Sequence, residues 1–207
     1  MSNITLYRHP LSGHAHRAEL FLSLLGLEAS YVDVDLLNGE HKGPTFLKKN
    51  PFGQVPVLED GDITLADSNA IIIYLARRYD DSDQWLPSDP VLAAQVEQYL
   101  SLAASKIANG PATARLITVF GAPLDADKAI TLAHSTLAVL DQQLEGRDWL
   151  VGSGPTLADV ANYSYIAHAP EGNVSLADYP HLRRWLQRVE HLPGFIPMAA
   201  SKAGLNA

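Results

Sequence analysis

The sequence predicts two domains, an α/β domain followed by an all-α domain. Apolar and polar residues alternate over residues 4–7 and 32–36, as in half-buried strands, and an apolar helical pattern lies between these runs. Strand signals fade from Asp89 onward, where long alanine-rich and leucine-rich stretches follow. We therefore expect domains at residues 1–79 and 89–207, joined at residues 80–88 by a linker that is rich in aspartate and contains a proline.

The first domain is expected to begin with a strand, a helix and a second strand. The helix should start near Ser12, present apolar residues at helical spacing, and end at Gly26, which readily adopts the left-handed conformation of a helix stop. A strand–helix–strand order within about 35 residues favours a right-handed crossover between two parallel strands.

A hairpin is expected next, because residues 55–58 and 63–65 flank the pair Asp60-Gly61, a strong turn signal. Val55-Pro56 stands at the start of the first run. Proline has no N–H to donate and occurs mainly on an edge strand or at a strand's first residue. We therefore expect an edge here, where an extended ligand can pair its backbone.

A further helix is expected from Ser68, preceded by Asp67. Helix starts present unpaired N–H groups and the positive end of the helix dipole, so a carboxylate can bind there. Arg77 and Arg78 follow near the negative end of the same helix.

In the second domain, Asp89-Pro90 reads as an N-cap with proline at the first helical position, and the helix should run to about Asn109. Pro111 should then kink or end that helix. Further amphipathic helices are expected around residues 129–144 and 182–192.

The segment from Thr156 to Asp159 has the spacing of a capping box and precedes an apolar run at residues 160–169. We interpret it as structural, marking the start of a buried helix.

Composition excludes several functions. The chain of 207 residues has no cysteine, so any thiol chemistry must use a sulfur that arrives with the substrate. Its net charge of −8, without a cluster of lysine or arginine, argues against a nucleic-acid partner. No export leader is evident, and no apolar run approaches the about 20 residues that span a bilayer. We expect a cytoplasmic protein without a membrane partner.

Motifs in a fixed order point to a family. They are HPLS at 9–12, GEHKGP at 39–44, NPFGQVPVLEDGD at 50–62, LADSNAI at 65–71 and PTLADV at 155–160. With these motifs the chain resembles a glutathione S-transferase over nearly its full length, closest to the serine-type phi and theta-like classes. The resemblance implies a thioredoxin-like first domain, an all-helical second domain, a homodimer, and a detoxification enzyme that conjugates glutathione, its co-substrate, to hydrophobic electrophiles.

The resemblance places the catalytic serine at Ser12, whose hydroxyl would donate to the glutathione sulfur. A thiol with a pKa near ~8.5 is only a few per cent ionised at neutral pH, so the protein must favour the anion. A purely structural alternative is that Ser12 only caps the first helix. Tyr7 is the second candidate, because other classes of the family use a tyrosine near the end of the first strand.

The resemblance also implies the glutathione contacts. The residue before a cis proline pairs its backbone with the cysteinyl unit, and the start of a helix holds the γ-glutamyl end. Ordinary helix capping and a solvated loop are the structural alternatives for the helix start and for the charged positions. The implied residues are Gln54, Val55 and Pro56 for the cysteinyl unit, Asp67 and Ser68 for the γ-glutamyl end, and His41 and Lys42 for the glycine carboxylate.

The electrophile pocket is expected between the domains, where pockets often form. Phe52 is either an aromatic knob at a subunit interface or a loop residue folded onto its own domain. Rough alignment with the family gives as pocket residues Leu11, Ala108, Ala112, Arg115 and Tyr165.

A metal site is not expected. His14 and His16 are two residues apart, so they do not share a helix face, and no acidic residue completes a ligand set with them or with His9. Alternatives to conjugation are a glutathione-binding module without catalysis, and a glutathione-dependent peroxidase or isomerase, which needs the same thiolate.

Overall fold

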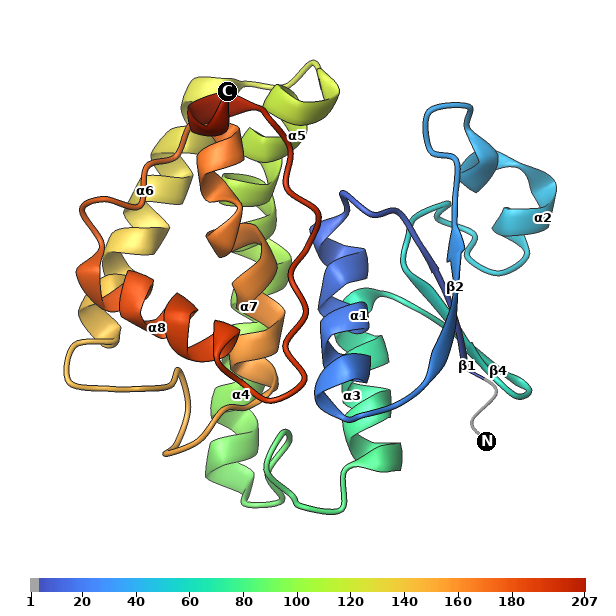
Figure 1. Cartoon of the computed structure of the whole chain (residues 1–207), viewed down its shortest axis with the longest axis horizontal. Helices are drawn as coiled ribbons and strands as arrows, with labels where there is room; N and C mark the ends of the chain where they lie inside the picture. Colours follow the sequence, from blue (N-terminus) through green and yellow to red (C-terminus); the bar gives the residue numbers. More distant parts are fainter. Residues whose placement is uncertain (1–3) are drawn as a thin grey trace. The chain divides into compact units, whose positions relative to one another are not determined.

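The computed structural model describes residues 4–207 and divides the chain into two compact units (Figure 1). One comprises the chain up to Asp81 together with Pro193–Ala199, and the other comprises Ser82–Leu192 and Ala200–Ala207. The division at Asp81 falls inside the expected linker at 80–88. The first three residues of the expected range 1–79 lie outside the described part.

The segment Pro193–Ala199 corrects the expectation that everything after residue 89 belongs to the helical domain. It returns to the first unit and runs beside α1 (Gly13–Leu24) (Figure 1). Ser23 Oγ donates to the carbonyl of Gly194 at 2.6 Å, and His16 Nε2 lies 2.9 Å from the carbonyl of Ile196. Gly194 has φ +85°, and a Cβ there would lie 2.7 Å from the Ser23 carbonyl oxygen, so only glycine fits this approach.

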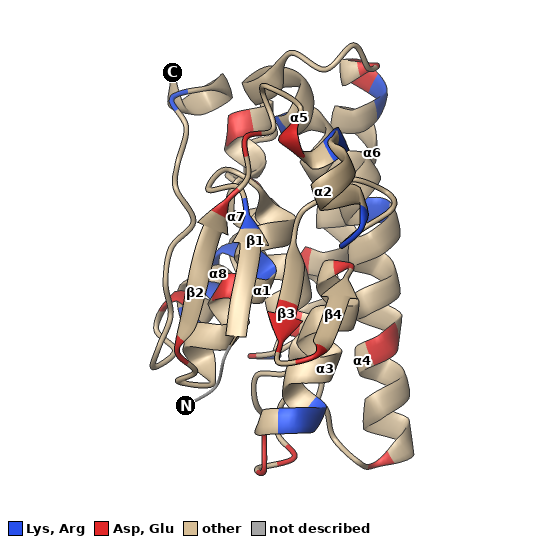
Figure 2. Ribbon diagram, turned by 90° about the vertical axis from the view of Figure 1, so that its right-hand side faces the viewer, with Lys and Arg blue, Asp and Glu red and all other residues tan. Residues whose placement is uncertain are grey.

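The first unit is built on a mixed sheet of four strands in the order β2-β1-β3-β4, seen side by side in Figure 2. The strands are β1 (Ile4–Arg8), β2 (Ala29–Asp33), β3 (Val57–Asp60) and β4 (Ile63–Ala66). β1 and β2 are parallel, which confirms the expected crossover through α1, and β3 is antiparallel to both β1 and β4.

Two strand predictions need correction. The second strand was expected over 32–36 but ends at Asp33, and Val34 instead packs in a buried cluster with Phe46 and Val57. The alternation of apolar and polar residues over 32–36 therefore does not mark a strand along its whole length. It arises because one buried side chain, Val34, follows the exposed edge strand β2. Pro56 does not mark an edge strand either, because β3 lies between β1 and β4, and Val55-Pro56 comes just before its first residue.

A helical layer completes the first unit. α3 (Ser68–Tyr79) packs with α1, and its last turn carries Arg77 and Arg78, as expected. Between β2 and β3 lie the 3-10 turn η1 (Glu40–Lys42) and the short α2 (Pro44–Leu47). The core side chains are apolar and almost completely buried; among them are Leu6, Phe21, Leu22, Leu58, Ile72 and Leu75.

The second unit is entirely helical in regular structure. Asp89 caps its first helix by accepting from the amides of Val91 and Leu92 at 3.0 and 2.9 Å, which confirms the predicted N-cap. No helix in residues 4–207 combines the length and apolarity needed to cross a membrane. The helices are α4 (Pro90–Leu102), η2 (Ala103–Ala112), α5 (Thr113–Phe120), α6 (Ala126–Gln143), α7 (Leu157–Ala167), η3 (Ala169–Gly172), α8 (Pro180–Glu190) and η4 (Gly204–Asn206).

Of the two outcomes expected at Pro111, a kink or a helix end, the helix end does not occur. The chain winds as a π-helix over Ala103–Ala112 and continues past Pro111 into α5. A wider turn redirects the hydrogen-bond ladder around the residue that lacks an N–H. Gly110 packs tightly here, since a Cβ would lie 3.0 Å from the Ala133 nitrogen on α6.

The capping box at the start of α7 is confirmed. Thr156 Oγ1 accepts from the Ala158 amide at 3.2 Å, and the Asp159 carboxylate accepts from the Thr156 amide at 2.8 Å. Asp159 is fully buried and also accepts from the Leu150 amide and from Trp185 Nε1 on α8. The cap therefore ties three segments of the second unit together.

Candidate functional site

One cavity of about 780 Å³ lies in the first unit and gathers three of the sequence motifs. The 39–44 loop, the 50–56 loop and the start of α3 form its walls, and α1 contributes His14. Every predicted glutathione contact lies on it. The residues that line it are His14, Leu36, His41, Lys42, Asn50, Pro51, Phe52, Gly53, Gln54, Val55, Pro56, Ala66, Asp67 and Ser68.

Asp67 forms the N-cap of α3 in an unusual backbone conformation. Its φ is +73°, a left-handed value that side chains other than glycine rarely adopt. One carboxylate oxygen, Oδ1, accepts from the amides of Asn69 and Ala70 at 2.9 and 3.0 Å. The capping interpretation is thus correct for Asp67, and the cap holds a strained residue at the cavity wall.

Ser68 is the first residue of α3, and its hydroxyl accepts a hydrogen bond from a buried arginine. Arg17 NH1 donates to Ser68 Oγ at 2.7 Å and to Asn69 Oδ1 at 2.8 Å, and both Arg17 and Ser68 are almost completely buried. The guanidinium charge adds to the positive end of the α3 dipole. This corner of the cavity therefore favours an anion.

The 50–56 loop forms one wall of the cavity. The Val55-Pro56 peptide bond is cis, which confirms the expectation drawn from the family resemblance. Asn50 shapes the loop, since its Nδ2 donates to the Gln54 carbonyl at 2.8 Å and its Oδ1 accepts from the Phe52 amide at 3.1 Å. Val55 precedes β3, whose pairing with β1 ends at Val57, so the ladder does not use its backbone.

His41 and Lys42 face the cavity from the neighbouring loop. Lys42 Nζ donates to the carbonyls of Phe52 and Gly53 at 3.1 and 3.0 Å, which joins the two loops. Gly53 has φ +57°, and a Cβ there would lie 2.6 Å from the His41 carbonyl oxygen. The close approach fixes the ammonium group at the cavity wall, where it can meet a carboxylate.

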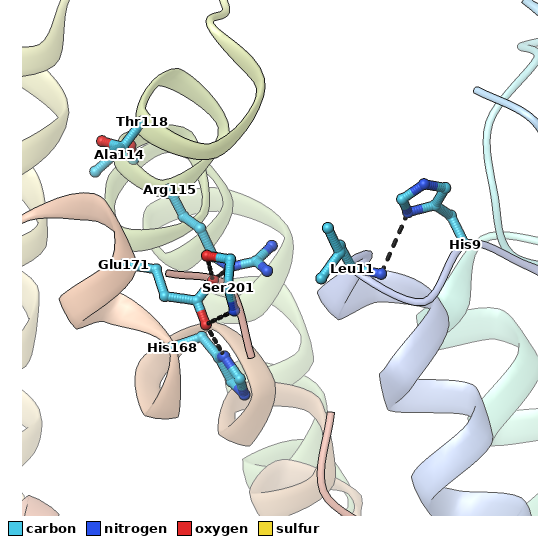
Figure 3. A network of polar contacts seen from close by, with 8 residues as sticks. All are labelled: His9, Leu11, Ala114, Arg115, Thr118, His168, Glu171 and Ser201. Carbon is cyan, nitrogen blue, oxygen red and sulfur yellow. Dashed lines mark hydrogen bonds and ion pairs between the residues drawn. The ribbon is translucent and has the colours of Figure 1, made fainter. Parts of the chain in front are cut away.

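Ser12 caps α1, since its Oγ accepts from the Ala15 amide at 3.2 Å. The turn before it is ordered by His9, whose Nδ1 accepts from the Leu11 amide at 3.2 Å (Figure 3). A hydroxyl that accepts one hydrogen bond still carries its proton, so capping and donation to a sulfur are compatible. Ser12 itself does not line the cavity, but His14, two residues along the same helix start, does.

Tyr7 has a structural role in the sheet. Its hydroxyl donates to Glu59 Oε2 at 2.9 Å, its ring packs edge-on against Phe46, and Lys49 Nζ lies 4.5 Å from the ring centre. Tyr7 does not line the cavity. The Tyr7 hydroxyl is thus engaged with Glu59 within the sheet.

Two other expectations concern a metal site and Phe52. Within residues 4–207, no group of three or more potential ligands could hold a metal ion. Phe52 is 80% exposed, so the interpretation that it folds onto its own domain is wrong.

Arg115 and Glu171 form a buried ion pair in the second unit (Figure 3). Arg115 Nε donates to Glu171 Oε2 at 2.7 Å, and the same carboxylate accepts from Ser201 Oγ at 2.7 Å and binds His168 Nδ1 at 2.6 Å. Although burial alone would raise it, the pKa of Glu171 is lowered by these hydrogen bonds and by the arginine charge. The ion pair accounts for Arg115 without a ligand. The other proposed electrophile contacts in this unit, Ala108, Ala112 and Tyr165, are half-buried or buried.

Sequence reasoning left two polar side chains of the cavity, His14 and Asn50, out of the predicted glutathione contacts. His14 was expected to be a surface or site-lining histidine rather than a metal ligand, but it was given no ligand contact, although its position two residues after Ser12 places it in the same helix turn. Asn50 opens the NPFGQVP motif, and its loop-shaping contacts follow from the asparagine habit of hydrogen-bonding backbone two residues away.

Comparisons with known proteins agree on one family. The chain matches the family models "Glutathione S-transferase, N-terminal domain" over residues 2–77 and "Glutathione S-transferase, C-terminal domain" over residues 115–193. It is 32% identical to glutathione S-transferase 3 of Zea mays, covering 94% of this chain and 92% of that protein.

Solved structures give the same picture. The glutathione S-transferase of Pseudomonas fluorescens has a TM-score of 0.88 at 35% identity, covering 94% of this chain and 98% of that one. A glutathione transferase homologue of Drosophila mojavensis, solved with bound glutathione, has a TM-score of 0.85 at 31% identity, covering 93% and 90%.

Proposed function

Because the chain belongs to the glutathione S-transferase family, we propose that it binds glutathione in the cavity of its first unit and that Ser12 keeps the glutathione sulfur ionised for attack on a hydrophobic electrophile. One observation carries the proposal: a single cavity joins an anion-favouring helix start, the main chain before a cis proline, and a fixed lysine. Glutathione offers a carboxylate at each end and a peptide between them. The relative solved with bound glutathione supports this choice of ligand.

The γ-glutamyl end would bind at the start of α3. Its α-carboxylate accepts a hydrogen bond from the Ser68 hydroxyl at the positive end of the α3 dipole, next to the buried charge of Arg17. Its α-amino group meets the Asp67 carboxylate. A charged hydrogen bond of this kind is worth about 1.5–3 kcal/mol.

The rest of the tripeptide would follow the cavity wall. The cysteinyl backbone pairs with the main chain of Val55, with Gln54 and Pro56 shaping the wall on either side. The glycine carboxylate meets Lys42 and His41. Binding at both ends fixes the cysteinyl sulfur in the middle.

Ser12 would activate the sulfur by donating its hydroxyl proton in a hydrogen bond to the thiolate. Lowering the thiol pKa by about two units requires ~2.7 kcal/mol of preference for the anion. One charge-assisted hydrogen bond together with the positive end of the α1 dipole supplies a stabilisation of this size. Since the chain has no cysteine, glutathione provides the only thiol in the reaction.

In the conjugation step the thiolate donates an electron pair to the electrophilic carbon and a C–S bond forms. With an aromatic halide, halide leaves with the electron pair of the C–X bond, and the thiol proton has already passed to solvent. The protein's contribution is to hold the anion in place. We retain as proposed electrophile contacts Leu11, Ala108, Ala112 and Tyr165.

We also propose that the chain forms a homodimer, as the family resemblance implies. The 80% exposure of Phe52 supports an intermolecular contact at this loop, since an aromatic ring in water loses the stabilisation of burial. Light scattering of the wild type and of Phe52→Ser tests this. A dimeric mass that falls in the variant is expected, and a monomeric wild type would contradict the proposal.

Calorimetric titration with glutathione, followed by assays with an aromatic halide, an organic peroxide and an isomerisable substrate, tests the proposed function. Binding with halide turnover is the expected result. Turnover of only the peroxide or the isomerisable substrate would replace conjugation by that reaction. Binding with no turnover would indicate a module without catalysis, and no heat at millimolar glutathione would refute the proposal.

A further inference from the structure

We infer that Asn50 is a positioning residue for glutathione binding, because its side-chain amide fixes the peptide unit between Gln54 and Val55. The inference rests on the proposed function, in which the cysteinyl unit pairs with the main chain of Val55. Asn50 lines the cavity and is only 3% exposed. It therefore supports the loop wall from within, four residues before the carbonyl that it holds.

The Asn50 side chain contacts two main-chain groups of the loop, and these determine how its amide is oriented. Its Oδ1 accepts from the Phe52 amide at 3.1 Å, and its Nδ2 donates to the Gln54 carbonyl at 2.8 Å. A main-chain N–H can only donate and a carbonyl can only accept, so turning the amide over would lose both hydrogen bonds. The donor of the side chain therefore faces Gln54.

The Asn50 main chain is itself anchored. Its N–H donates to the carbonyl of Phe46, on α2, at 3.0 Å, and its carbonyl accepts from the Gly53 amide at 2.9 Å. Phe46 is 5% exposed and belongs to the core of the first unit. The side chain that reaches Gln54 thus projects from a backbone whose two polar groups are both held.

The hydrogen bond to the Gln54 carbonyl also sets the direction of the Val55 N–H. Both groups belong to one trans peptide unit, since the cis bond comes after Val55. Such a unit is planar, and its C=O and N–H point in opposite directions. Within residues 4–207 the Val55 amide donates to no protein group. We assign this N–H, on a residue that lines the cavity, to the carbonyl of the cysteinyl unit.

With glutathione bound, two hydrogen bonds lie in series across this peptide unit. Asn50 Nδ2–H donates to the Gln54 carbonyl, and the Val55 N–H donates to the cysteinyl carbonyl. Hydrogen bonds in such a chain polarise one another, so each is stronger when the other is present. Asn50 therefore acts on the ligand through one peptide unit, which it orients and polarises.

The test combines two variants with three peptides. Asn50→Asp keeps an oxygen for the Phe52 amide but places a second oxygen against the Gln54 carbonyl. Asn38→Asp is the control, since it adds the same charge at an exposed residue that does not line the cavity. The peptides are glutathione, an analogue with a trans alkene in place of the cysteinyl-glycine amide, and an analogue with an ester in place of the γ-glutamyl-cysteinyl amide. The alkene analogue lacks the acceptor for Val55 N–H, whereas the ester analogue keeps it.

Calorimetry gives each dissociation constant, after thermal melts have shown that both variants are folded. Asn50→Asp should weaken glutathione and the ester analogue about tenfold, the upper end of the range for one hydrogen bond. It should leave the alkene analogue unchanged, because that peptide offers nothing to the Val55 N–H, and Asn38→Asp should leave all three peptides unchanged. An equal loss for all three peptides in Asn50→Asp, or the selective loss in Asn38→Asp, would overturn the inference.

Proton–nitrogen NMR of the wild type provides a readout that does not depend on a variant's stability. Glutathione should move the Val55 N–H and the Asn50 Nδ2–H resonances downfield together and slow their exchange with water, and the alkene analogue should move neither. A Val55 resonance that moves without that of Asn50, or equal shifts with the alkene analogue, would overturn the inference. If the wild type binds no glutathione, the proposed function fails. If it binds glutathione and the Asn50 resonance stays in place, only the role of Asn50 fails.

Discussion

Replacing Asp159 with alanine should destabilise the second unit strongly, because its buried carboxylate is the common acceptor of three segments. It accepts from the amides of Thr156 and Leu150 at 2.8 and 3.1 Å and from Trp185 Nε1 at 2.8 Å. Alanine would leave these three donors buried without an acceptor.

The magnitude follows from two opposing contributions. A buried donor left without a partner costs about 1–3 kcal/mol, so three of them cost about 6 kcal/mol. Against this, burial raises the pKa of the Asp159 carboxyl to about 6 from 3.8, despite the hydrogen bonds it accepts. Alanine also removes the desolvation penalty of the ionised carboxylate, which offsets part of that cost. The net expected loss in the free energy of unfolding is about 3 kcal/mol.

The same pKa gives the sign of the pH dependence. A carboxyl whose pKa is higher in the folded state binds its proton more tightly there, so it stabilises the fold most below the unfolded value of 3.8, and this stabilisation is lost as the pH rises through about 6. The alanine variant lacks this contribution. The difference between wild type and Asp159→Ala should therefore grow by about 1 kcal/mol from pH 7 to pH 5.

Urea unfolding followed by tryptophan fluorescence and circular dichroism measures both effects. Asp125→Ala is the matched control, since Asp125 is an exposed N-cap of α6 that accepts only from the Lys128 amide, at 3.0 Å, and should cost about 1 kcal/mol. The reasoning would be refuted if Asp159→Ala cost no more than Asp125→Ala. It would also be refuted if the difference shrank at the lower pH.

Three further changes test other parts of the structure. Tyr7→Phe should leave turnover within about twofold of wild type, because the hydroxyl donates to Glu59; a loss of thiolate formation would restore Tyr7 as the activator. Glu171→Gln should cost about 3 kcal/mol and speed amide hydrogen exchange at Ser201, whose amide donates to Glu171 Oε1; unchanged exchange would contradict the anchoring role. Lys42→Ala should weaken glutathione about tenfold but leave γ-glutamylcysteine, which lacks the glycine carboxylate, unaffected; equal losses would place the glycine end elsewhere.

Local sequence signals predicted the fold where a short stretch determines the structure. The Asp89-Pro90 cap, the capping box at Thr156 and the left-handed Gly26 are all present, because caps and turns depend on a few neighbouring residues. Signals that depend on distant partners failed. Val34 looked like a strand residue, but its burial comes from Phe46 and Val57, which no local pattern identifies.

For the site, too, motifs predicted some residues, whereas contacts between distant parts of the chain were not predicted. The residues of the cavity walls followed from motifs, and the family resemblance gave the cis bond at Pro56. His14 was expected only as a surface or site-lining residue, because its contact with Ser68, 54 residues further along the chain, leaves no local signal. The return of Pro193–Ala199 to the first unit likewise depends on Ser23 and His16, through contacts that sequence spacing does not reveal.

The thiolate of bound glutathione, followed by its ultraviolet absorbance as the pH is raised, tests the central claim most directly. Wild type, Tyr7→Phe and Ser12→Ala are compared at saturating glutathione, with calorimetry to show that all three bind the peptide. The sulfur should ionise about two pH units below free glutathione in the wild type and in Tyr7→Phe, and near the free value in Ser12→Ala. A wild-type titration curve that Ser12→Ala leaves unchanged would contradict the account.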